Sequence, residues 1–203
     1  MREVAALFVD VEGCTRLCEE LSPRAMNAVI ESYFSAYLEA VRSHGGEVTE
    51  IMGDGLLALF EQPERRANVR AAIEATEAIR TITGTLNRRR RHPITVNVGL
   101  NAGRALTGVT RLRGSSGERW VYAADGAVTN VAARLCALAS GGQTLTTREV
   151  ADLLPARCEC RSLGPQSLKN VAGTVEVVEF RGCAHPCAAF AERLRARPLV
   201  RGA

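Results

Sequence analysis

Residues 46–60 read GEVTEIMGDGLLALF, and the rest of the chain can be organised around this stretch. Val48, Glu50 and Met52 alternate with the residues between them, which is the period of a β-strand, and residues 56–60 form a second apolar run of strand length. The Gly-Asp-Gly between the runs supplies the positive φ angles of a tight turn, so the stretch predicts a β-hairpin. Asp54 is then either an ordinary turn former or a carboxylate at an open tip that a bulky charged group can approach.

The composition is that of one soluble globular domain, with 203 residues of which 46% are hydrophobic and 24% charged. No apolar run reaches the roughly 18 residues of a membrane span, and no signal peptide opens the chain. We therefore expect a cytoplasmic protein without a membrane span. The net charge of +4 is mild and comes partly from four arginines at 88–91, so it does not predict nucleic-acid binding. That run is most simply a solvated loop, and a phosphate or membrane contact is the alternative.

Seven cysteines are present, an odd number in a chain without an export signal, so we expect reduced thiols. Cys158, Cys160, Cys183 and Cys187, with His185 nearby, could in principle form a metal site. Their spacings fit no common zinc pattern, and the first two alternate as strand residues do. Metal binding by these cysteines is therefore the less favoured interpretation.

The first apolar run, VAALFVDV at residues 4–11, has the length and composition of a central, doubly covered strand. Asp10 interrupts it near its end, and a charge there is costly unless it is paired or bound to a metal. A short helix predicted from Thr15 to Leu21 would direct backbone N–H groups toward whatever Asp10 holds. A carboxylate beside such an anion site suits a metal-bound phosphate.

The remaining helices and strands are predicted from the spacing of apolar residues and from glycine and proline at the ends of elements. Long amphipathic helices are predicted from Pro23 to about His44 and from Pro63 onward, and another helix opens near Asp125. Further strands are predicted at 94–100, 120–122, 143–146, 157–163 and 175–180, with a short helix at 147–154.

A strand ending in FVDVEGCT, a long helix and then EIMGDGLLALF resemble the catalytic domain of class III nucleotidyl cyclases. The resemblance implies an α+β fold with a ferredoxin-like βαββαβ core, in which helices flank a mainly antiparallel central sheet. Residues 104–119 occupy the place of the family's protruding dimerisation arm. The resemblance spans about residues 4–181, so we expect a catalytic domain at 1–181. A tail follows at 182–203, where Phe190 and Leu194 suit a short amphipathic helix.

The same resemblance assigns two divalent ions, Mg²⁺ or Mn²⁺, to Asp10, Val11 and Asp54. Paired carboxylates suit such hard cations, which prefer oxygen ligands and bridge substrate phosphates. The segment between strand and helix is then a substrate contact through Gly13, Cys14 and Thr15. Cys14 departs from the family, which usually has phenylalanine at that position.

Asn130 and Arg134 lie at i and i+4, so they share one face of a helix. In isolation they read as a capping residue and a solvated charge. The resemblance instead implies that Asn130 orients the ribose and that Arg134 stabilises negative charge on the phosphates during cyclisation. It also implies that Lys169 contacts the triphosphate, although Asn170 replaces the glycine that usually follows this lysine.

Glu50 and Ala123 occupy the two positions that select the purine in this family. A carboxylate at 50 accepts hydrogen bonds from N1–H and the exocyclic NH₂ of guanine, whereas N1 of adenine is itself an acceptor. Ala123 contributes no side-chain hydrogen bond, so half of the usual recognition pair is missing. GTP is therefore the favoured substrate, with ATP and a pyrimidine triphosphate as alternatives.

In the family that this chain resembles, each active site lies between two subunits. Asp10 and Asp54 would come from one chain, and the residues that bind the base, ribose and phosphates from the other: Glu50, Ala123, Asn130, Arg134 and Lys169. A homodimer would then build two equivalent sites. The competing hypothesis is a cyclase-homology module that binds a nucleotide or a partner without turnover. No sensor domain is recognisable in these residues, so any regulatory domain would lie outside them.

Overall fold

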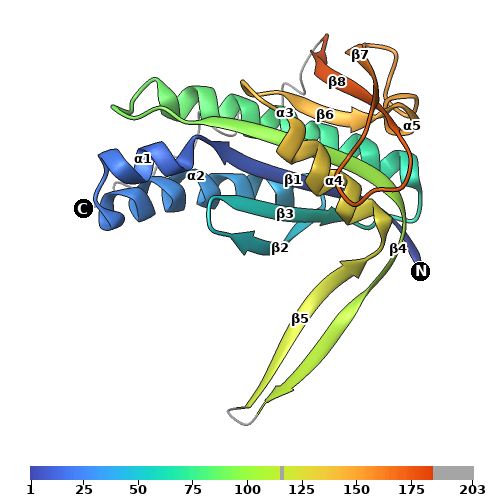
Figure 1. Ribbon diagram of the computed structural model, residues 1–203, viewed down its shortest axis with the longest axis horizontal. Helices are drawn as coiled ribbons and strands as arrows, with labels where there is room; N and C mark the ends of the chain where they lie inside the picture. Colours follow the sequence, from blue (N-terminus) through green and yellow to red (C-terminus); the bar gives the residue numbers. More distant parts are fainter. Residues whose placement is uncertain (115–116, 185–203) are drawn as a thin grey trace.

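A computed structural model describes residues 1–114 and 117–184, without the side chains of Thr15, Arg16, Leu112, Arg119, Val121 and Asp125 (Figure 1). The strands are β1 (Arg2–Glu12), β2 (Gly46–Met52), β3 (Gly55–Phe60), β4 (Thr95–Gly114), β5 (Gly117–Asp125), β6 (Thr144–Thr147), β7 (Cys158–Gln166) and β8 (Val175–Cys183). The helices are α1 (Cys14–Glu20), α2 (Pro23–Ser43), α3 (Arg65–Asn87), α4 (Ala127–Leu138) and α5 (Arg148–Ala151).

One sheet runs in the order β2-β3-β1-β4-β6-β8-β7, and β5 pairs with β4 outside this path. All pairings are antiparallel except that of β4 with β6. The predicted α+β fold, with its mainly antiparallel sheet flanked by helices, is confirmed. Within the described residues, no helix is long and apolar enough to cross a membrane.

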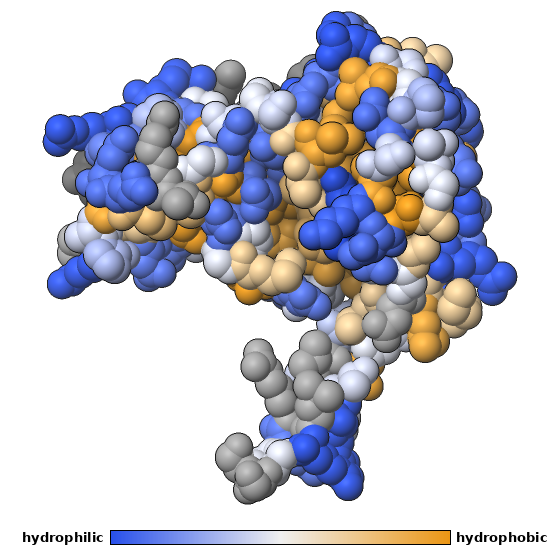
Figure 2. All heavy atoms as spheres, viewed as in Figure 1, coloured by the Kyte–Doolittle hydropathy of each residue, from blue (hydrophilic) through white to orange (hydrophobic). Residues whose placement is uncertain are grey.

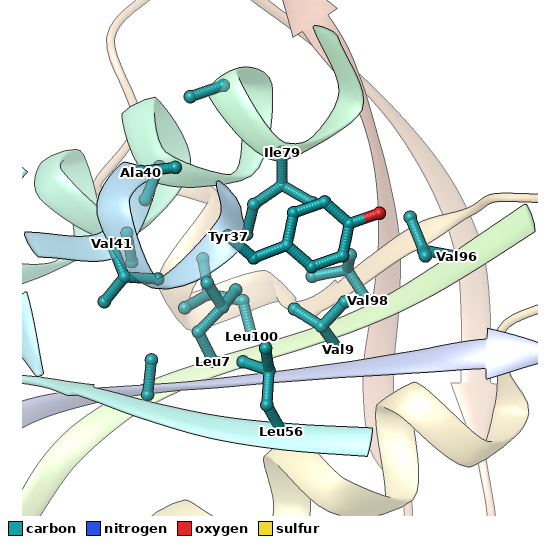
Figure 3. Close-up of a cluster of buried hydrophobic side chains, with 14 of the residues drawn as sticks. Leu7, Val9, Tyr37, Ala40, Val41, Leu56, Ile79, Val96, Val98 and Leu100 are labelled. Atoms are coloured by element: carbon teal, nitrogen blue, oxygen red, sulfur yellow. The ribbon is translucent and has the colours of Figure 1, made fainter. Parts of the chain in front are cut away.

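The main core lies between the sheet and the pair α2 and α3 (Figure 3). Proline at the first position of α2 and the side chain of Ser22, which accepts from Ala25 N, start that helix. Alternate residues of the central strands point at the apolar stripes of α2 and α3, among them Leu7, Val9, Leu56, Val96, Val98 and Leu100 against Tyr37, Ala40 and Val41 of α2 and Ile79 of α3. This face of the sheet is therefore closed to ligands.

The opposite face carries α4 and a smaller core that includes Val4, Ala6, Leu57, Leu59, Ala105, Val128 and Ala132. Beyond this core, β4 and β5 leave the body as a long hairpin, which stands clear of the rest of the molecule (Figures 1 and 2). We call residues 106–114 and 117–125 the arm. The predicted protrusion at 104–119 is therefore present, but it starts at Leu106 and its second strand continues to Asp125.

Two local expectations differ from the structure. The second long helix begins at Arg65 rather than Pro63, because residues 61–64 are held by Asn68, whose buried amide donates to Gln62 O and accepts from Gln62 N. The final strand extends to Cys183, two residues into the predicted tail; residues 185–203, with Phe190 and Leu194, lie outside the described part.

The expectation of reduced thiols is wrong for Cys158 and Cys183, which form a disulfide between β7 and β8. The two strands pair in register at these residues, with Cα atoms 4.0 Å apart, so the thiols meet. This pairing also removes both residues from the metal site considered above. Cys160 lies on the same strand as an exposed free thiol, while His185 and Cys187 fall outside the described residues.

Candidate active site

Asp10 and Asp54, the predicted metal carboxylates, come together at one end of the sheet. Asp10 is near the end of β1 and pairs in register with Gly55, the residue after Asp54. The turn is tied to β1 by a hydrogen bond of 3.0 Å from Val11 N to Asp54 O. Gly53 has a φ of 62°, the left-handed conformation for which glycine is suited. Asp54 therefore occupies the tip that the sequence predicted, directly beside Asp10.

The two carboxylates are not neutralised by basic side chains. Burial, and then the negative charge of Asp54, raise the pKa of Asp10 above its usual range. Within the described residues, no lysine, arginine or histidine forms an ion pair with either aspartate. A divalent cation is the partner that such a pair of oxygen donors fits.

No cluster of three or more described His, Cys, Asp or Glu side chains has the arrangement of a metal site by itself. Two carboxylates therefore supply only part of a coordination shell, which suits an ion that also binds substrate phosphate oxygens and water. Val11, the third predicted ligand, has a buried apolar side chain, so it can contribute only through its backbone.

The segment between β1 and α1 borders this pair. Gly13 precedes the helix with a φ of 70°. Cys14 is half-buried, and burial, followed by its contact with Asp54, raises the pKa of its thiol to about 12. Cys14 is thus a neutral thiol at physiological pH. Thr15 lies in the first turn of α1, and its side chain is outside the described part.

Asn130 and Arg134 are carried by α4 on the opposite face from α2 and α3. Asn130 is exposed in the second turn, and Arg134 follows one turn later and is half-exposed. The helix lies against β4 at Gly99, where an added Cβ would be 2.1 Å from Ala132 O. In the described part of the chain, no hydrogen bond or ion pair connects these two residues with Asp10 or Asp54.

Lys169 is exposed in the turn between β7 and β8, beside the buried Leu168. Val171 N donates to Leu168 O at 3.1 Å and closes this turn. Asn170 has a φ of 61°, and it is the only described residue other than glycine with a positive φ. Asparagine tolerates this conformation better than most residues, which explains how it replaces the usual glycine here.

The regular alternation predicted for residues 48–52 is wrong at Thr49. Val48 pairs with Ala58, but Glu50 pairs with Leu57, so Thr49 is an extra residue in a β-bulge. Directly paired residues share a face, and Leu57 belongs to the core on the α4 side. The bulge therefore places Glu50 on the α4 face, whereas Val48 packs against the α2 side.

Ala123 lies in β5 opposite Gly108 and is half-buried. Its neighbours Tyr122 and Ala124 pack against the core on the α4 side, so Ala123 faces the other way. The structure thus brings together Asp10, Asp54 and Cys14, and it leaves Glu50, Ala123, Asn130, Arg134 and Lys169 on separate segments.

Sequence reasoning missed two polar contacts of Glu12 and Glu61 that fix the surroundings of these segments. Glu12 Oε2 accepts from Gly141 N at 2.7 Å, just after α4. Glu61 Oε2 accepts from the Tyr122 hydroxyl at 2.5 Å, at the root of the arm. Both pairs join residues more than sixty positions apart, and no local pattern signals them.

Comparisons with known proteins identify the family. The family model described as the adenylate and guanylate cyclase catalytic domain matches residues 1–181. Adenylate cyclase 1 of Rhizobium meliloti (strain 1021) is 26% identical over 188 residues, 89% of this chain and 28% of that protein. An adenylate cyclase of Mycobacterium bovis (strain ATCC BAA-935 / AF2122/97) is 27% identical over 169 residues, 83% of this chain and 37% of that protein. The chain thus spans less than two fifths of either relative.

Solved structures of both kinds of cyclase share the fold. The adenylyl cyclase CyaB from P. aeruginosa has a TM-score of 0.83 at 22% identity, covering 91% of this chain and 96% of that one. The guanylyl cyclase Cya2 has a TM-score of 0.74 at 25% identity, covering 92% and 95%. By the extent of the family match, this chain belongs to the adenylate and guanylate cyclase catalytic domain family and is a nucleotidyl cyclase domain.

Proposed function

We propose that two copies of this chain convert a nucleoside triphosphate, with GTP favoured, to the 3′,5′-cyclic monophosphate and pyrophosphate. The observation that carries the proposal is the pair Asp10 and Asp54, which lie side by side at an open sheet end and form no ion pair with a basic side chain in the described part of the chain. Asp10, Asp54 and the backbone of Val11 would hold two Mg²⁺ or Mn²⁺ ions. Such ions, when bound, acidify the ribose 3′-hydroxyl and polarise the phosphates.

The other residues act on the substrate directly. Arg134 places a guanidinium where charge grows on the α-phosphate as the 3′-oxygen attacks and pyrophosphate leaves. Asn130 orients the ribose, and Lys169 neutralises charge on the departing phosphates. Gly13, Cys14 and Thr15 border the phosphates, and the neutral thiol of Cys14 adds no further negative charge there.

A homodimer is supported by the distribution of exposed apolar side chains. In the described part of the chain, seven large apolar residues have more than two fifths of their surface exposed. Five of them lie on β2 and on the arm, namely Ile51, Met52, Leu106, Val109 and Trp120, and the other two are Met1 and Leu138. Apolar side chains gathered on one edge and on a protruding hairpin are typical of a protein interface. In the described part of the chain, Asn130 and Arg134 form no hydrogen bond or ion pair with Asp10 or Asp54, so a second copy would complete each site.

Glu50 supports GTP over ATP. Its position on the α4 face, set by the bulge at Thr49, leaves the carboxylate on the side where the base would lie. A carboxylate accepts from two donors of guanine and from only the amino group of adenine. ATP and pyrimidine triphosphates stay as alternatives because Ala123 offers no side-chain hydrogen bond. The cytoplasm, where nucleoside triphosphates are abundant, is the compartment that this substrate requires.

The test is to incubate the purified chain with Mn²⁺ and each of GTP, ATP, CTP and UTP, and to identify products by mass spectrometry. Cyclic GMP is the expected product, and another cyclic nucleotide would refute the assignment of Glu50. Asp54→Ala should abolish turnover with an unchanged circular dichroism spectrum. If the dimeric wild-type protein forms no cyclic product from any nucleotide, the chain is a binding module.

A further inference from the structure

A part-buried hydrogen bond between two side chains joins the arm to the end of β3. The Tyr122 hydroxyl, in β5, donates to Glu61 Oε2 at 2.5 Å. Glu61 directly follows β3, the strand that begins beside Asp54. Arg2 Nη1 lies 3.9 Å from the same carboxylate oxygen, and the Tyr122 ring packs against the core on the α4 side. The contact thus joins the arm to the strand that carries the metal-site turn.

The Glu61 carboxylate depends on the Tyr122 hydroxyl for its hydrogen bonding. Its side chain is only 19% exposed, and its second oxygen, Oε1, is buried without a hydrogen-bond partner among the described residues. Burial, and then the bond to Glu61, raise the pKa of the Tyr122 phenol, so the hydroxyl stays protonated as a donor at neutral pH. Without that donor, a mostly buried carboxylate would keep only the distant Arg2, and it would be driven to turn toward water.

The continuous strand β4 and the packing of Tyr122 and Ala124 on the α4-side core also hold the root of the arm, but two cavities border it. A cavity of about 380 Å³ borders Glu61 and Tyr122 on one side, and a second of about 530 Å³ borders Glu61 and Arg2 on another. The arm then projects from the body without further support in the view of Figure 2. Eight residues separate Leu106 from the end of β4, which is ~26 Å of strand. A tilt of ~10° at the root would therefore move the tip by ~4–5 Å.

We propose that Tyr122 and Glu61 are a positioning pair that sets the angle of the arm for assembly of the intersubunit site. The inference rests on the homodimer of the proposed function and assigns to its arm the residues that hold it in place. The pair fixes the exposed Val109 and Trp120 of the arm relative to β3, and it orients Ala123, next to Tyr122, at the predicted base position. A chain whose arm samples other angles is competent to dimerise only part of the time, which weakens association.

The test measures the dimer dissociation constant by sedimentation velocity, with thermal unfolding of each variant. Tyr122→Phe keeps the ring and removes the donor, and Glu61→Ala removes the acceptor. Each should raise the dissociation constant about tenfold, as expected for loss of a hydrogen bond to a charged group, and the double variant should be no worse than either. Glu61→Gln keeps an acceptor for the hydroxyl and should stay within about twofold of wild type. Tyr33→Phe is the matched control, because its hydroxyl donates to Asn87 at 2.7 Å within the α2–α3 core.

The outcomes separate this inference from the proposed function. A dissociation constant for Tyr122→Phe within twofold of wild type, or additive effects in the double variant, would overturn the positioning role while leaving the dimer intact. An equal weakening by Tyr33→Phe would also overturn it, since general destabilisation would then explain the effect. A wild-type chain that stays monomeric at every concentration would instead refute the homodimer, and the positioning role with it.

Discussion

Gly99→Ala is the substitution that most directly tests whether α4 positions the proposed catalytic residues. Gly99 lies in β4, paired with Phe8 on one side and Leu145 on the other, and faces α4. An added Cβ would lie 2.1 Å from Ala132 O and 2.3 Å from Cys136 N, both of them backbone atoms. The added Cβ is fixed to the backbone of β4, and the atoms it meets belong to the backbone of α4, so no side-chain rotation can relieve the clash. The helix as a whole must therefore move.

The size of that movement follows from the geometry. Real Cβ contacts essentially never fall below 3.0 Å, so the contact with Ala132 O must lengthen by at least 3.0 − 2.1 = 0.9 Å. Arg134 lies between the two contacted residues, and Asn130 is two positions before the first. A misplacement of about 1 Å in a catalytic group can cost ~100-fold in rate. Overpacking of a core costs ~1–3 kcal/mol, which lowers the unfolding midpoint by ~2–10 °C in a chain of this size.

The assay compares turnover and melting of Gly99→Ala with those of wild type and of Gly84→Ala. Gly84 is a matched control because it lies within α3 with no heavy atom within 4 Å of an added Cβ. Alanine there should stabilise the helix by up to ~1 kcal/mol and leave turnover unchanged. Gly99→Ala should lose ~100-fold in turnover while remaining folded. Turnover within threefold of wild type would refute the placement of Asn130 and Arg134 by this contact.

Three further predictions follow from single features. Asp10→Asn should abolish turnover. It should also raise the unfolding midpoint of the metal-free protein by ~2 °C at pH 7.5, because the pKa of Asp10 is raised in the folded state and its charge therefore destabilises the fold as the pH rises. Thermal melting in the presence of a chelator measures this gain, which should be absent near pH ~4. Cys158→Ser should lower the midpoint by ~5–10 °C only in non-reducing buffer, and denatured wild type should titrate 7 − 2 = 5 thiols; seven would refute the disulfide. Asn170→Ala should cost ~1 kcal/mol in urea denaturation and Asn170→Gly almost nothing; equal costs would contradict the positive φ.

The order of elements was predictable because it depends on local patterns, whereas the meeting of Asp10 with Asp54 was implied by the family resemblance. The Gly-Asp-Gly turn and the apolar runs of β1 and β3 fix their own pairing once the strands are antiparallel. The stripes of α2 and α3 were predicted mainly from aliphatic residues, so polar core members were overlooked. Asn68 and Thr76 are fully buried, because the first bonds to Glu3 O and Gln62 O and the second to Ala72 O.

The features that could not be predicted are pairings between residues distant in sequence. The disulfide depends on the register of β7 against β8, and the Tyr122–Glu61 contact depends on where the arm leaves the sheet. The bulge at Thr49 is local, but a strand of mixed polar and apolar residues does not reveal which residue is extra. The pairing with β3 decides which face each residue of β2 occupies, since Leu56 belongs to the core on the α2 side and Leu57 to the core on the α4 side.

These unpredicted features have a common consequence for the site. Glu50, Arg134 and Ala123 lie on three segments, and a non-periodic feature at the sheet adjusts the placement of each segment. The bulge at Thr49 turns Glu50 to the open face, the bare surface of Gly99 admits the helix that carries Arg134, and Tyr122 fixes the strand of Ala123. The pattern of polar and apolar residues can place these segments in a fold, but the orientation of each segment relative to the sheet comes from these contacts. Variation at Thr49, Gly99 and Tyr122 is therefore expected to change catalysis and base selection without touching a residue that contacts the substrate.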